Sequence, residues 1–350
     1  MNPRFTIKRL TELYYGWSAV TSDINRDGAM DIISGPFYYL GPSFTVRRIF
    51  RTDRVYNPAT EYAPDMVNFT YDYTGDGWPD ILASGWDRKL GTRPIDLYVN
   101  PKGEPRRWDP TTVLPTPNSE AVVMADVDGD KKPEMIFGMA NGYGWAKPDP
   151  ANPTAEWKVY NVAPANQKGN IHGLGGIGDV NSDGRADIVT IGGWYEQPAG
   201  GATVTPWTFH EGNFGTASTE MGVYDVNGDG LTDVAGILRG VVGGDVVFSE
   251  AHAARFADMN GDKIPDFIVG KRYWSHLETY NGPDPYGPAV IYIYKTVRNP
   301  KAPGGAEFVP ELVHNRSGVG SAFEVADINK DGRPDIAVAT AYGTQVFLSK

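Results

Sequence analysis

The sequence predicts an all-β fold, a seven-bladed β-propeller, and three observations lead to this prediction. One nine-residue pattern of acidic and amide residues occurs seven times in the 350-residue chain. Successive copies begin 49, 54, 53, 46, 33 and 69 residues apart, and a four-stranded blade takes ~40–50 residues. Apolar stretches of strand length lead into and out of each copy. We therefore expect a single domain, residues 1–350, in which each copy is a tight turn between the first two strands of a blade.

The repeated pattern is Asp-x-(Asp/Asn/Thr)-x-Asp-(Gly/Lys)-x-x-(Asp/Glu), whose residues are numbered here as positions 1 to 9. A match to this pattern is expected by chance in roughly one chain in tens, so the copies are true repeats. They define repeats one to seven, which begin at Asp23, Asp72, Asp126, Asp179, Asp225, Asp258 and Asp327.

The two ends of the chain predict how the ring closes. After its pattern, the seventh repeat has room for only two further strands before Lys350, so its outer strand is missing. Residues 5–10, Phe-Thr-Ile-Lys-Arg-Leu, read almost like residues 44–49, Phe-Thr-Val-Arg-Arg-Ile, which we expect to be an outer strand. We therefore expect residues 5–10 to complete the last blade, because such closure leaves no long unpaired sheet edge.

The composition excludes several classes of protein. The chain has no cysteine, which excludes disulfides, thiol nucleophiles and thiolate metal sites, so any metal must be held by oxygen or imidazole. Its 32 Lys and Arg against 43 Asp and Glu give a net charge of -11, which argues against a nucleic-acid partner. No apolar run approaches the ~18 residues that span a bilayer, so we expect no membrane insertion. We expect a monomer.

The loops are predicted to bind calcium. Side-chain oxygens at positions 1, 3, 5 and 9, with Gly usually at position 6, surround a hard cation with oxygen ligands, and the stricter octahedron of magnesium fits less well. An EF-hand would need a bidentate Glu at position 12, and no repeat has one. The alternative is that these are ordinary Asp/Asn/Gly turns. We expect up to seven structural Ca²⁺ ions, with the ligands Asp23, Asn25, Asp27, Asp31, Asp72, Thr74, Asp76, Asp80, Asp126, Asp128, Asp130, Glu134, Asp179, Asn181, Asp183, Asp187, Asp225, Asn227, Asp229, Asp233, Asp258, Asn260, Asp262, Asp266, Asp327, Asn329, Asp331 and Asp335.

With these loops the whole chain resembles the FG-GAP or VCBS-type repeats of seven-bladed propellers, which also occur in integrin α-subunit heads. Residues 172–175, 193–198 and 270–276 look like segments of stand-alone bacterial propellers of this class. A weaker similarity is to the propeller part of aldos-2-ulose dehydratase, a sugar lyase, although no catalytic motif matches. The resemblance implies a calcium-binding propeller related to carbohydrates, and it does not select one function. Calcium favours an extracellular or periplasmic location with a signal removed, and the cytoplasm is the alternative because no signal segment is present.

The candidate functional site lies on the face opposite the calcium loops. The loops that lead into the first strands and those that join the second and third strands are unlike one another and carry most of the functional side chains. A pocket on the axis with histidine, carboxylate, arginine and aromatic groups suits a carbohydrate or another small polar or anionic ligand. The candidate catalytic residues are His172, His252, His276, Arg272 and Glu220, and the candidate substrate-binding residues are Tyr15, Trp17, Glu61, Trp86, Arg88, Glu120, Trp145, Trp194, Arg239 and Tyr273.

Two functions remain open on the sequence alone. As a sugar lyase or dehydratase, the protein would use a histidine as general base and Arg272, or a further divalent metal held by histidine, to stabilise the developing charge. As a lectin-like or adhesion module, it would bind a sugar with aromatic side chains and use calcium only for structure. Only the calcium loops repeat along the chain, which favours one axial site over seven peripheral ones.

Removing calcium is expected to lower the melting temperature strongly. Each site kept at ~100 times its dissociation constant contributes roughly 2.7 kcal/mol to the free energy of unfolding. Thermal unfolding in calcium and in EGTA measures this contribution. Identical melting curves in the two buffers would show that the loops do not use calcium for stability.

Overall fold

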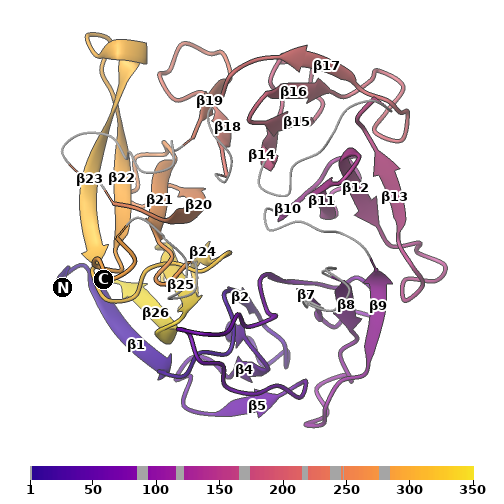
Figure 1. Cartoon of the computed structure of the whole chain (residues 1–350), viewed down its shortest axis with the longest axis vertical. Coiled ribbons are helices and arrows are strands. Elements are labelled where there is room, and N and C mark those ends of the chain that lie inside the picture. Colours follow the sequence, from indigo (N-terminus) through magenta and orange to yellow (C-terminus); the bar gives the residue numbers. More distant parts are fainter. Residues whose placement is uncertain are drawn as a thin grey trace.

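The computed structural model describes residues 2–84, 94–115, 122–164, 174–214, 220–236, 246, 248–275 and 284–350, and these form a ring of β-sheets around a central axis (Figure 1). Every named strand pair is antiparallel. The described residues contain a single short 3-10 helix, η1 (Pro303–Gly305). The predicted all-β propeller is confirmed.

Six of the sheets are four-stranded blades, each with its first strand nearest the axis. The blades of repeats one to three consist of β2 (Ala19–Ser22), β3 (Asp31–Ser34), β4 (Phe37–Tyr39) and β5 (Arg47–Ile49); β6 (Asn68–Tyr71), β7 (Asp80–Ser84), β8 (Ile95–Tyr98) and β9 (Pro110–Leu114); β10 (Val122–Ala125), β11 (Glu134–Met139), β12 (Gly142–Lys147) and β13 (Lys158–Asn161). Those of repeats four, six and seven consist of β14 (Leu174–Gly178), β15 (Asp187–Thr190), β16 (Gly193–Glu196) and β17 (Thr208–Glu211); β20 (Ala251–Ala257), β21 (Asp266–Lys271), β22 (Ile291–Arg298) and β23 (Ala306–His314); β24 (Glu324–Ala326), β25 (Asp335–Thr340), β26 (Gly343–Ser349) and β1 (Phe5–Thr11).

The predicted number of blades is wrong for the part of the chain that the structure describes. Within the described residues, repeat five forms a sheet of two strands, β18 (Gly222–Tyr224) and β19 (Asp233–Ala235), so the structure shows six four-stranded blades and not seven. The short spacing of 33 residues between repeats five and six explains the difference, because it leaves less chain than the ~40–50 residues that a full blade takes.

The predicted closure of the ring is confirmed. Strand β1 pairs with β26 in a register that runs from Phe5 opposite Ser349 to Arg9 opposite Gln345. The N-terminal strand thus becomes the outer strand of the last blade, as its likeness to residues 44–49 indicated. Both chain ends lie together at this blade (Figure 1).

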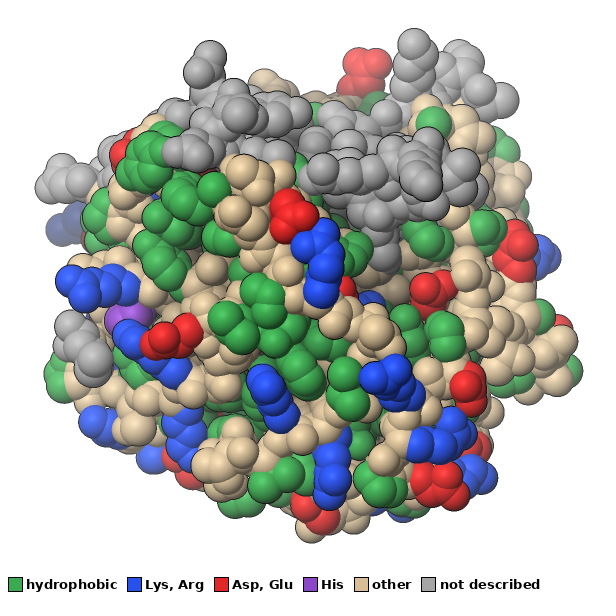
Figure 2. Space-filling view, turned by 60° about the horizontal axis from the view of Figure 1, so that its bottom comes forward, with side chains coloured by type: hydrophobic (Ala, Val, Ile, Leu, Met, Phe, Trp, Pro, Cys, Tyr) green, Lys and Arg blue, Asp and Glu red, His purple; other side chains and the backbone are tan. Residues whose placement is uncertain are grey.

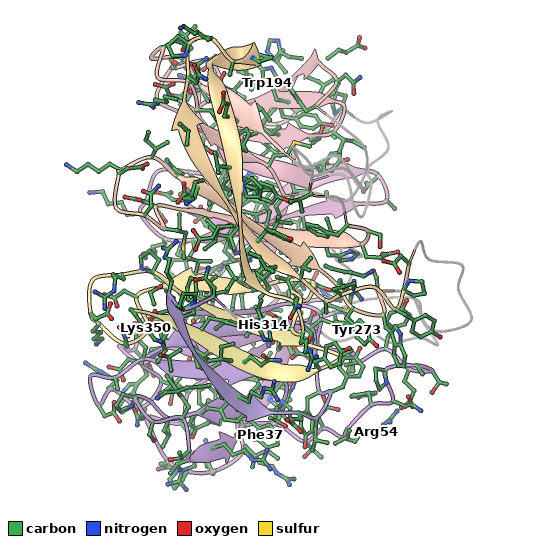
Figure 3. All side chains as sticks on the ribbon, turned by 90° about the vertical axis from the view of Figure 1, so that its left-hand side faces the viewer. Phe37, Arg54, Trp194, Tyr273, His314 and Lys350 are labelled. Atoms are coloured by element: carbon green, nitrogen blue, oxygen red, sulfur yellow. The ribbon has the colours of Figure 1, made fainter. Side chains whose placement is uncertain are left out.

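The acidic loops all lie on one face of the ring. In repeat one, Asp23 directly follows β2 and Asp31 is the first residue of β3, and the other six repeats place their loops in the same way. Lys350, which follows a strand held against the loop of repeat seven, marks the loop face in Figure 3, and Arg54 and Tyr273 lie at the opposite edge.

The hydrophobic core lies mainly between neighbouring sheets. Buried clusters join the blades of repeats two and three, three and four, one and two, and six and seven. Repeats four and five meet more closely. A Cβ atom on Gly176 of β14 would lie 2.2 Å from the carbonyl oxygen of Met221 beside β18, so only glycine permits this approach.

Asp65 connects the first two blades. Its carbonyl oxygen accepts a hydrogen bond from the Trp17 amide at 2.7 Å, and its Oδ2 accepts one from the Gly35 amide at 2.9 Å. The guanidinium of Arg51 lies 3.1 Å from its other carboxylate oxygen, and the Asp65 side chain is fully buried. Asp65 therefore holds together three segments: the one that precedes β2, the one that joins β3 to β4, and the one that follows β5.

Replacing Asp65 by Ala is expected to destabilise the protein by about 3–5 kcal/mol, because it removes the nearer carboxylate from the buried Arg51 charge and leaves it only Asp53 at 3.9 Å. Glu61→Ala is the control. Glu61 pairs with Arg54 at 2.8 Å on the surface, and such a pair contributes about 1 kcal/mol or less. Denaturant unfolding of both variants tests the difference, and equal losses would contradict this role for Asp65.

Candidate functional site

The seven acidic loops share one hydrogen-bonded conformation. In every repeat the amide of position 6 donates to Oδ2 of position 1, at 2.7 to 3.1 Å. The amide of position 7 likewise donates to Oδ1 of position 5, at 2.8 to 3.0 Å. The carboxylates at positions 1 and 5 thus fix the conformation of the loop through hydrogen bonds within the chain itself.

Two residues of each loop have a left-handed backbone. The sequence predicted the sharp turn at position 6, where Lys131 and Lys263 adopt φ of 67° and 68° in place of the usual glycine. Position 4 is left-handed as well, including Arg26 at φ 57° and Lys330 at φ 59°, and this was not predicted. The loop conformation therefore overrides the preference of a lysine or arginine backbone.

In five repeats the carboxylate at position 9 is buried and accepts backbone hydrogen bonds on both oxygens. In repeat four, Oδ2 of Asp187 accepts from the amide of Val180 at position 2, and Oδ1 accepts from the amide of Gln197 beyond the third strand, both at 2.9 Å. The same arrangement recurs at Asp31, Asp266 and Asp335, and at Asp80 with the amide of Thr74 replacing that of position 2. Position 9 thus ties the loop to the third strand.

Burial changes the acidity of these carboxyl groups. It raises the pKa of Asp31, Asp80, Asp187 and Asp266 to about 6 and that of Glu134 to about 7, although the backbone hydrogen bonds act in the opposite direction. Each charge is therefore costly to keep in the loop without a nearby cation.

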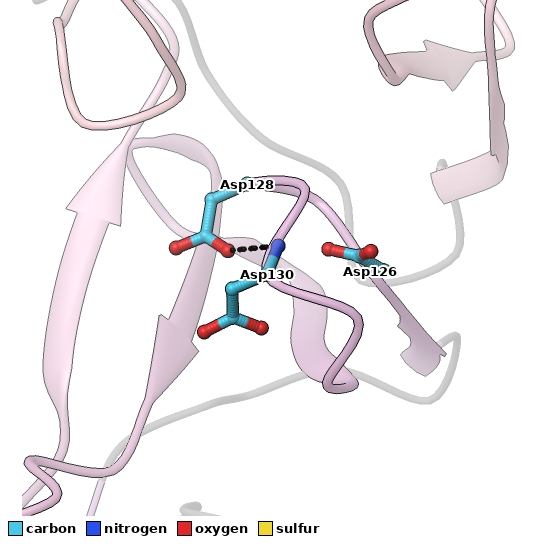
Figure 4. A group of neighbouring side chains, drawn as sticks. All are labelled: Asp126, Asp128 and Asp130. Atoms are coloured by element: carbon cyan, nitrogen blue, oxygen red, sulfur yellow. Dashed lines mark hydrogen bonds between the residues drawn. The ribbon is translucent and has the colours of Figure 1, made fainter.

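The side-chain oxygens of the loops fit a hard cation. In repeat three the carboxylates of Asp126, Asp128 and Asp130 approach so closely that one oxygen of each lies within 4.8 Å of the others (Figure 4). The other repeats have Asn or Thr at position 3, which supplies a neutral oxygen at the same place. Oxygen ligands of this kind suit calcium, which the side chains at positions 1, 3 and 5 would hold.

Arg272 and His252, two predicted catalytic residues, lie in contact. The Nη1 group of Arg272 donates to Nε2 of His252 at 2.6 Å. Arg272 is 2 % exposed, and its guanidinium lies 4.3 Å from the centre of the Trp17 ring. Because arginine can only donate, Nε2 of His252 is the accepting nitrogen and its lone pair is already engaged.

The predicted aromatic residues are spread over the ring. Trp17 and Trp145 are fully buried, so a sugar ring has no access to them in this conformation, and Trp145 stacks on Tyr160 at 4.3 Å. Trp194 stacks on His210 of the outer strand at 4.2 Å. Tyr15 packs edge-on against Phe37. These four do not meet at one site.

Tyr273 and Glu61 lie on the face opposite the loops. The Tyr273 ring stacks between Tyr342 at 4.3 Å and Trp274 at 5.3 Å, which makes a partly exposed aromatic group. Glu61 pairs with Arg54. The remaining candidates, His172, His276, Trp86, Arg88, Glu120 and Arg239, lie outside the described residues.

A cavity of about 510 Å³ lies on the axis of the ring. It extends along β18, from Glu220 before the strand to Tyr224 at its end, and among the described residues Glu220 is the one predicted catalytic residue in its wall. The carboxylate of Glu220 contacts the Arg255 guanidinium and accepts a hydrogen bond from the Ala254 amide at 3.2 Å. Glu324 lies in the same wall, and burial raises its pKa although the Arg255 charge opposes the shift. The described part of the cavity wall thus carries one basic and two acidic groups.

The sequence analysis missed Arg255 and Glu324, although the repeat contains the signal that identifies them. Both stand three residues before position 1, in the first strand of their blade. Six of the seven residues at this place line the cavity: Phe69, Val123, Gly176, Gly222, Arg255 and Glu324. Aligning the repeats on position 1 and reading this column singles out the two charged residues.

The outer surface offers no comparable concentration of polar groups in the view of Figure 2. Basic, acidic and apolar side chains are interspersed there over the described residues. No helix in the described part of the chain is long and apolar enough to cross a membrane.

Ring and loops together define a β-propeller built from repeats with acidic turns between their first two strands. The chain carries FG-GAP repeats: residues 319–348 match the FG-GAP repeat family, and residues 72–137 match the FG-GAP-like repeat family. A search of curated proteins finds no match.

Two solved structures are similar over most of the chain. One is a lectin from Agrocybe aegerita that recognises non-reducing terminal N-acetylglucosamine, with 17% identity, a TM-score of 0.40, and coverage of 93% of this chain and 75% of the lectin. The other is a rhamnogalacturonan lyase from Bacillus licheniformis, with 11% identity, a TM-score of 0.45, and coverage of 100% and 76%. At these values neither similarity carries an argument about ligand or reaction.

The two roles of the loop carboxylates can be separated in repeat six. In EGTA, Asp266→Ala is expected to cost about 2–5 kcal/mol, because the buried amides of Met259 and Thr296 lose their acceptor. Asp262→Ala, at the exposed position 5, is expected to cost about 1 kcal/mol under the same conditions. Urea unfolding in chelator gives both values, and a larger loss for Asp262→Ala would contradict the bracing role of position 9.

Proposed function

We propose that this protein is a calcium-stabilised propeller that binds a carbohydrate in its axial cavity. The observation that carries the proposal is the composition of the cavity wall. One arginine and two carboxylates, Arg255, Glu220 and Glu324, stand among apolar and aromatic groups in a volume of about 510 Å³. Binding sites for small molecules typically have this size and this mixture of an apolar wall with few polar groups.

The wall supplies both kinds of contact that a sugar ring makes. Phe69, Tyr224 and Phe256 are partly exposed aromatic residues of the cavity, and aromatic faces pack against the C–H groups of a pyranose. Carboxylates accept hydrogen bonds from the hydroxyl groups of a sugar, and a guanidinium donates hydrogen bonds to them. Arg255 is balanced by two acidic groups, so the described charges favour a neutral sugar over an acidic one.

Binding without chemistry is the function that the described residues support best. A general base needs a free lone pair near the substrate, and Arg272 already donates to Nε2 of His252. His252 is also not part of the cavity wall. A sugar lyase or dehydratase is the second candidate. It is favoured by the contact between His252 and Arg272, since such a pair can donate hydrogen to a developing oxyanion.

The calcium ions have a structural role in this proposal. The loops lie on one face of the ring, where calcium offsets the buried carboxylates at position 9. Calcium sites of this kind favour an extracellular or periplasmic protein, because free calcium is abundant there. We propose that the protein acts as a monomer.

Binding is tested by screening neutral and acidic glycans and measuring the affinity of the best ligand by calorimetry. Glu324→Gln keeps the size of the side chain but removes its charge, and is expected to weaken binding on the order of tenfold or more, since hydrogen bonds to charged groups contribute ~1.5–3 kcal/mol. The control is Glu12→Gln, a surface residue paired with Arg9, which should bind as the wild type does. Unchanged affinity of a well-folded Glu324→Gln variant would show that the sugar does not bind in the axial cavity.

Turnover distinguishes the two candidates. A lyase releases unsaturated sugar products that absorb ultraviolet light, and in that case His252→Gln should abolish their formation while binding persists. A ligand that binds and is recovered intact supports the binding module.

A further inference from the structure

The loop of repeat three differs chemically from the other six. It has an acidic residue at each of positions 1, 3, 5 and 9, and its position 3 is Asp128, where five repeats have Asn and one has Thr. In four of the Asn repeats the position 3 amide donates to Oδ2 of position 5, at 2.9 to 3.1 Å. Asp128 has no hydrogen to donate, so two carboxylates face each other (Figure 4).

The ammonium group of Lys147 fills this place. Its Nζ contacts Oδ2 of Asp128 and lies 3.3 Å from Oδ2 of Asp130. These are oxygens of two of the three carboxylates that converge in this loop. The Lys147 side chain is 28 % exposed, so the contact is partly shielded from water.

Lys147 stands at a strand position where the other blades do not send a cation into the loop. Position 10, the residue directly after the nine-residue pattern, pairs with a residue of the third strand, and Lys147 directly follows that partner. The equivalent residues in the other four-stranded blades are Leu40, Val99, Glu196, Lys295 and Leu348. Lys295 is the informative comparison. Its Nζ lies 3.4 Å from Glu311 on the outer strand, while the loop of repeat six uses its Asn260 amide instead.

A second change in repeat three is compensated by the same lysine. In five repeats, the residue two places after the partner of position 10 donates its amide to the carboxylate of position 9. In repeat three this residue is Pro148, which has no amide hydrogen. Oε2 of Glu134 still accepts from Val127 at 2.8 Å, but the hydrogen bond to the third strand is lost. Lys147 restores the connection between this strand and the loop.

We propose that Lys147 is the resident cation of the repeat-three loop, so that calcium must displace its ammonium group and binds this loop more weakly than the others. The inference rests on the calcium sites of the proposed function. Displacement has room, because Lys147 and Pro148 line a cavity of about 250 Å³ between the loops of repeats two and three. The extra carboxylate of Asp128 is therefore a counter-charge for lysine, and it does not mark the strongest calcium site.

The test compares wild type with Lys147→Met and with the control Lys102→Met, a lysine that lies 3.6 Å from Asp76 in repeat two and is 64 % exposed. Calcium titration by calorimetry is expected to show one weak site in the wild type that becomes at least about tenfold tighter in Lys147→Met, because a unit charge next to the ion is removed. The melting temperature in EGTA is expected to drop in Lys147→Met, because the carboxylates of Asp128 and Asp130 lose their cation. Lys102→Met should change neither measurement.

Unchanged calcium affinities together with unchanged melting in EGTA would overturn the proposal. If the wild type binds no calcium at all, the calcium part of the proposed function fails, and the melting data alone decide the role of Lys147. Should Lys147→Met not fold, the double variant with Asp128→Asn supplies the answer. The Asn amide then bonds Asp130 as in the other repeats, and recovery of folding supports the proposal while continued misfolding overturns it.

Discussion

The buried carboxylate at position 9 is the group on which the architecture of five of the blades depends. It stands at the first residue of the second strand and accepts one amide hydrogen from the loop and another from the third strand or a residue just beyond it, so it fixes the loop and these two strands against one another. Its burial is costly for a charged group, as the pKa of about 6 for Asp187 shows. A cation bound nearby reduces that cost, which links metal binding to the stability of the sheet.

The ring separates the groups that hold it together from those that face its axis. The carboxylates at positions 1 and 5 lie in the loops on one face of the ring, and the carboxylate at position 9 forms hydrogen bonds inside the blade. Arg255, Glu220 and Glu324 act on the axis, where strands of different repeats meet. The glycine-rich strand β14 brings repeat four against repeat five, whose described residues form a sheet of two strands where the other repeats have four. The axial cavity is therefore asymmetric, although the loops are nearly identical.

The sequence was sufficient where the same chemistry recurs at fixed spacing. Positions 1 to 9, their place between the first two strands, and the closure by residues 5–10 all follow from such recurrence. The blade count failed because repeat five is short, and length alone does not show that its sheet narrows. The axial residues were harder to predict. Glu220 was identified, but Arg255 and Glu324 belong to strands of different repeats, and only the ring geometry shows that they meet. The contact of His252 with Arg272 was likewise not readable, because it depends on the register of β20 against β21.

The residue three places before each loop takes no part in the hydrogen bonds that form the loop. The seven residues at this place range from glycine to phenylalanine, arginine and glutamate, while the acidic turn that follows them keeps one conformation. The residues that form the loop and the residues that line the cavity thus occupy different positions of the same repeat. Arg255 and Glu324 can therefore be exchanged without removing a hydrogen bond of the loops, whereas Gly176 at the same place is fixed by its close approach to the Met221 carbonyl oxygen. The chemistry of the axis can thus change at some repeats while the loops keep the scaffold.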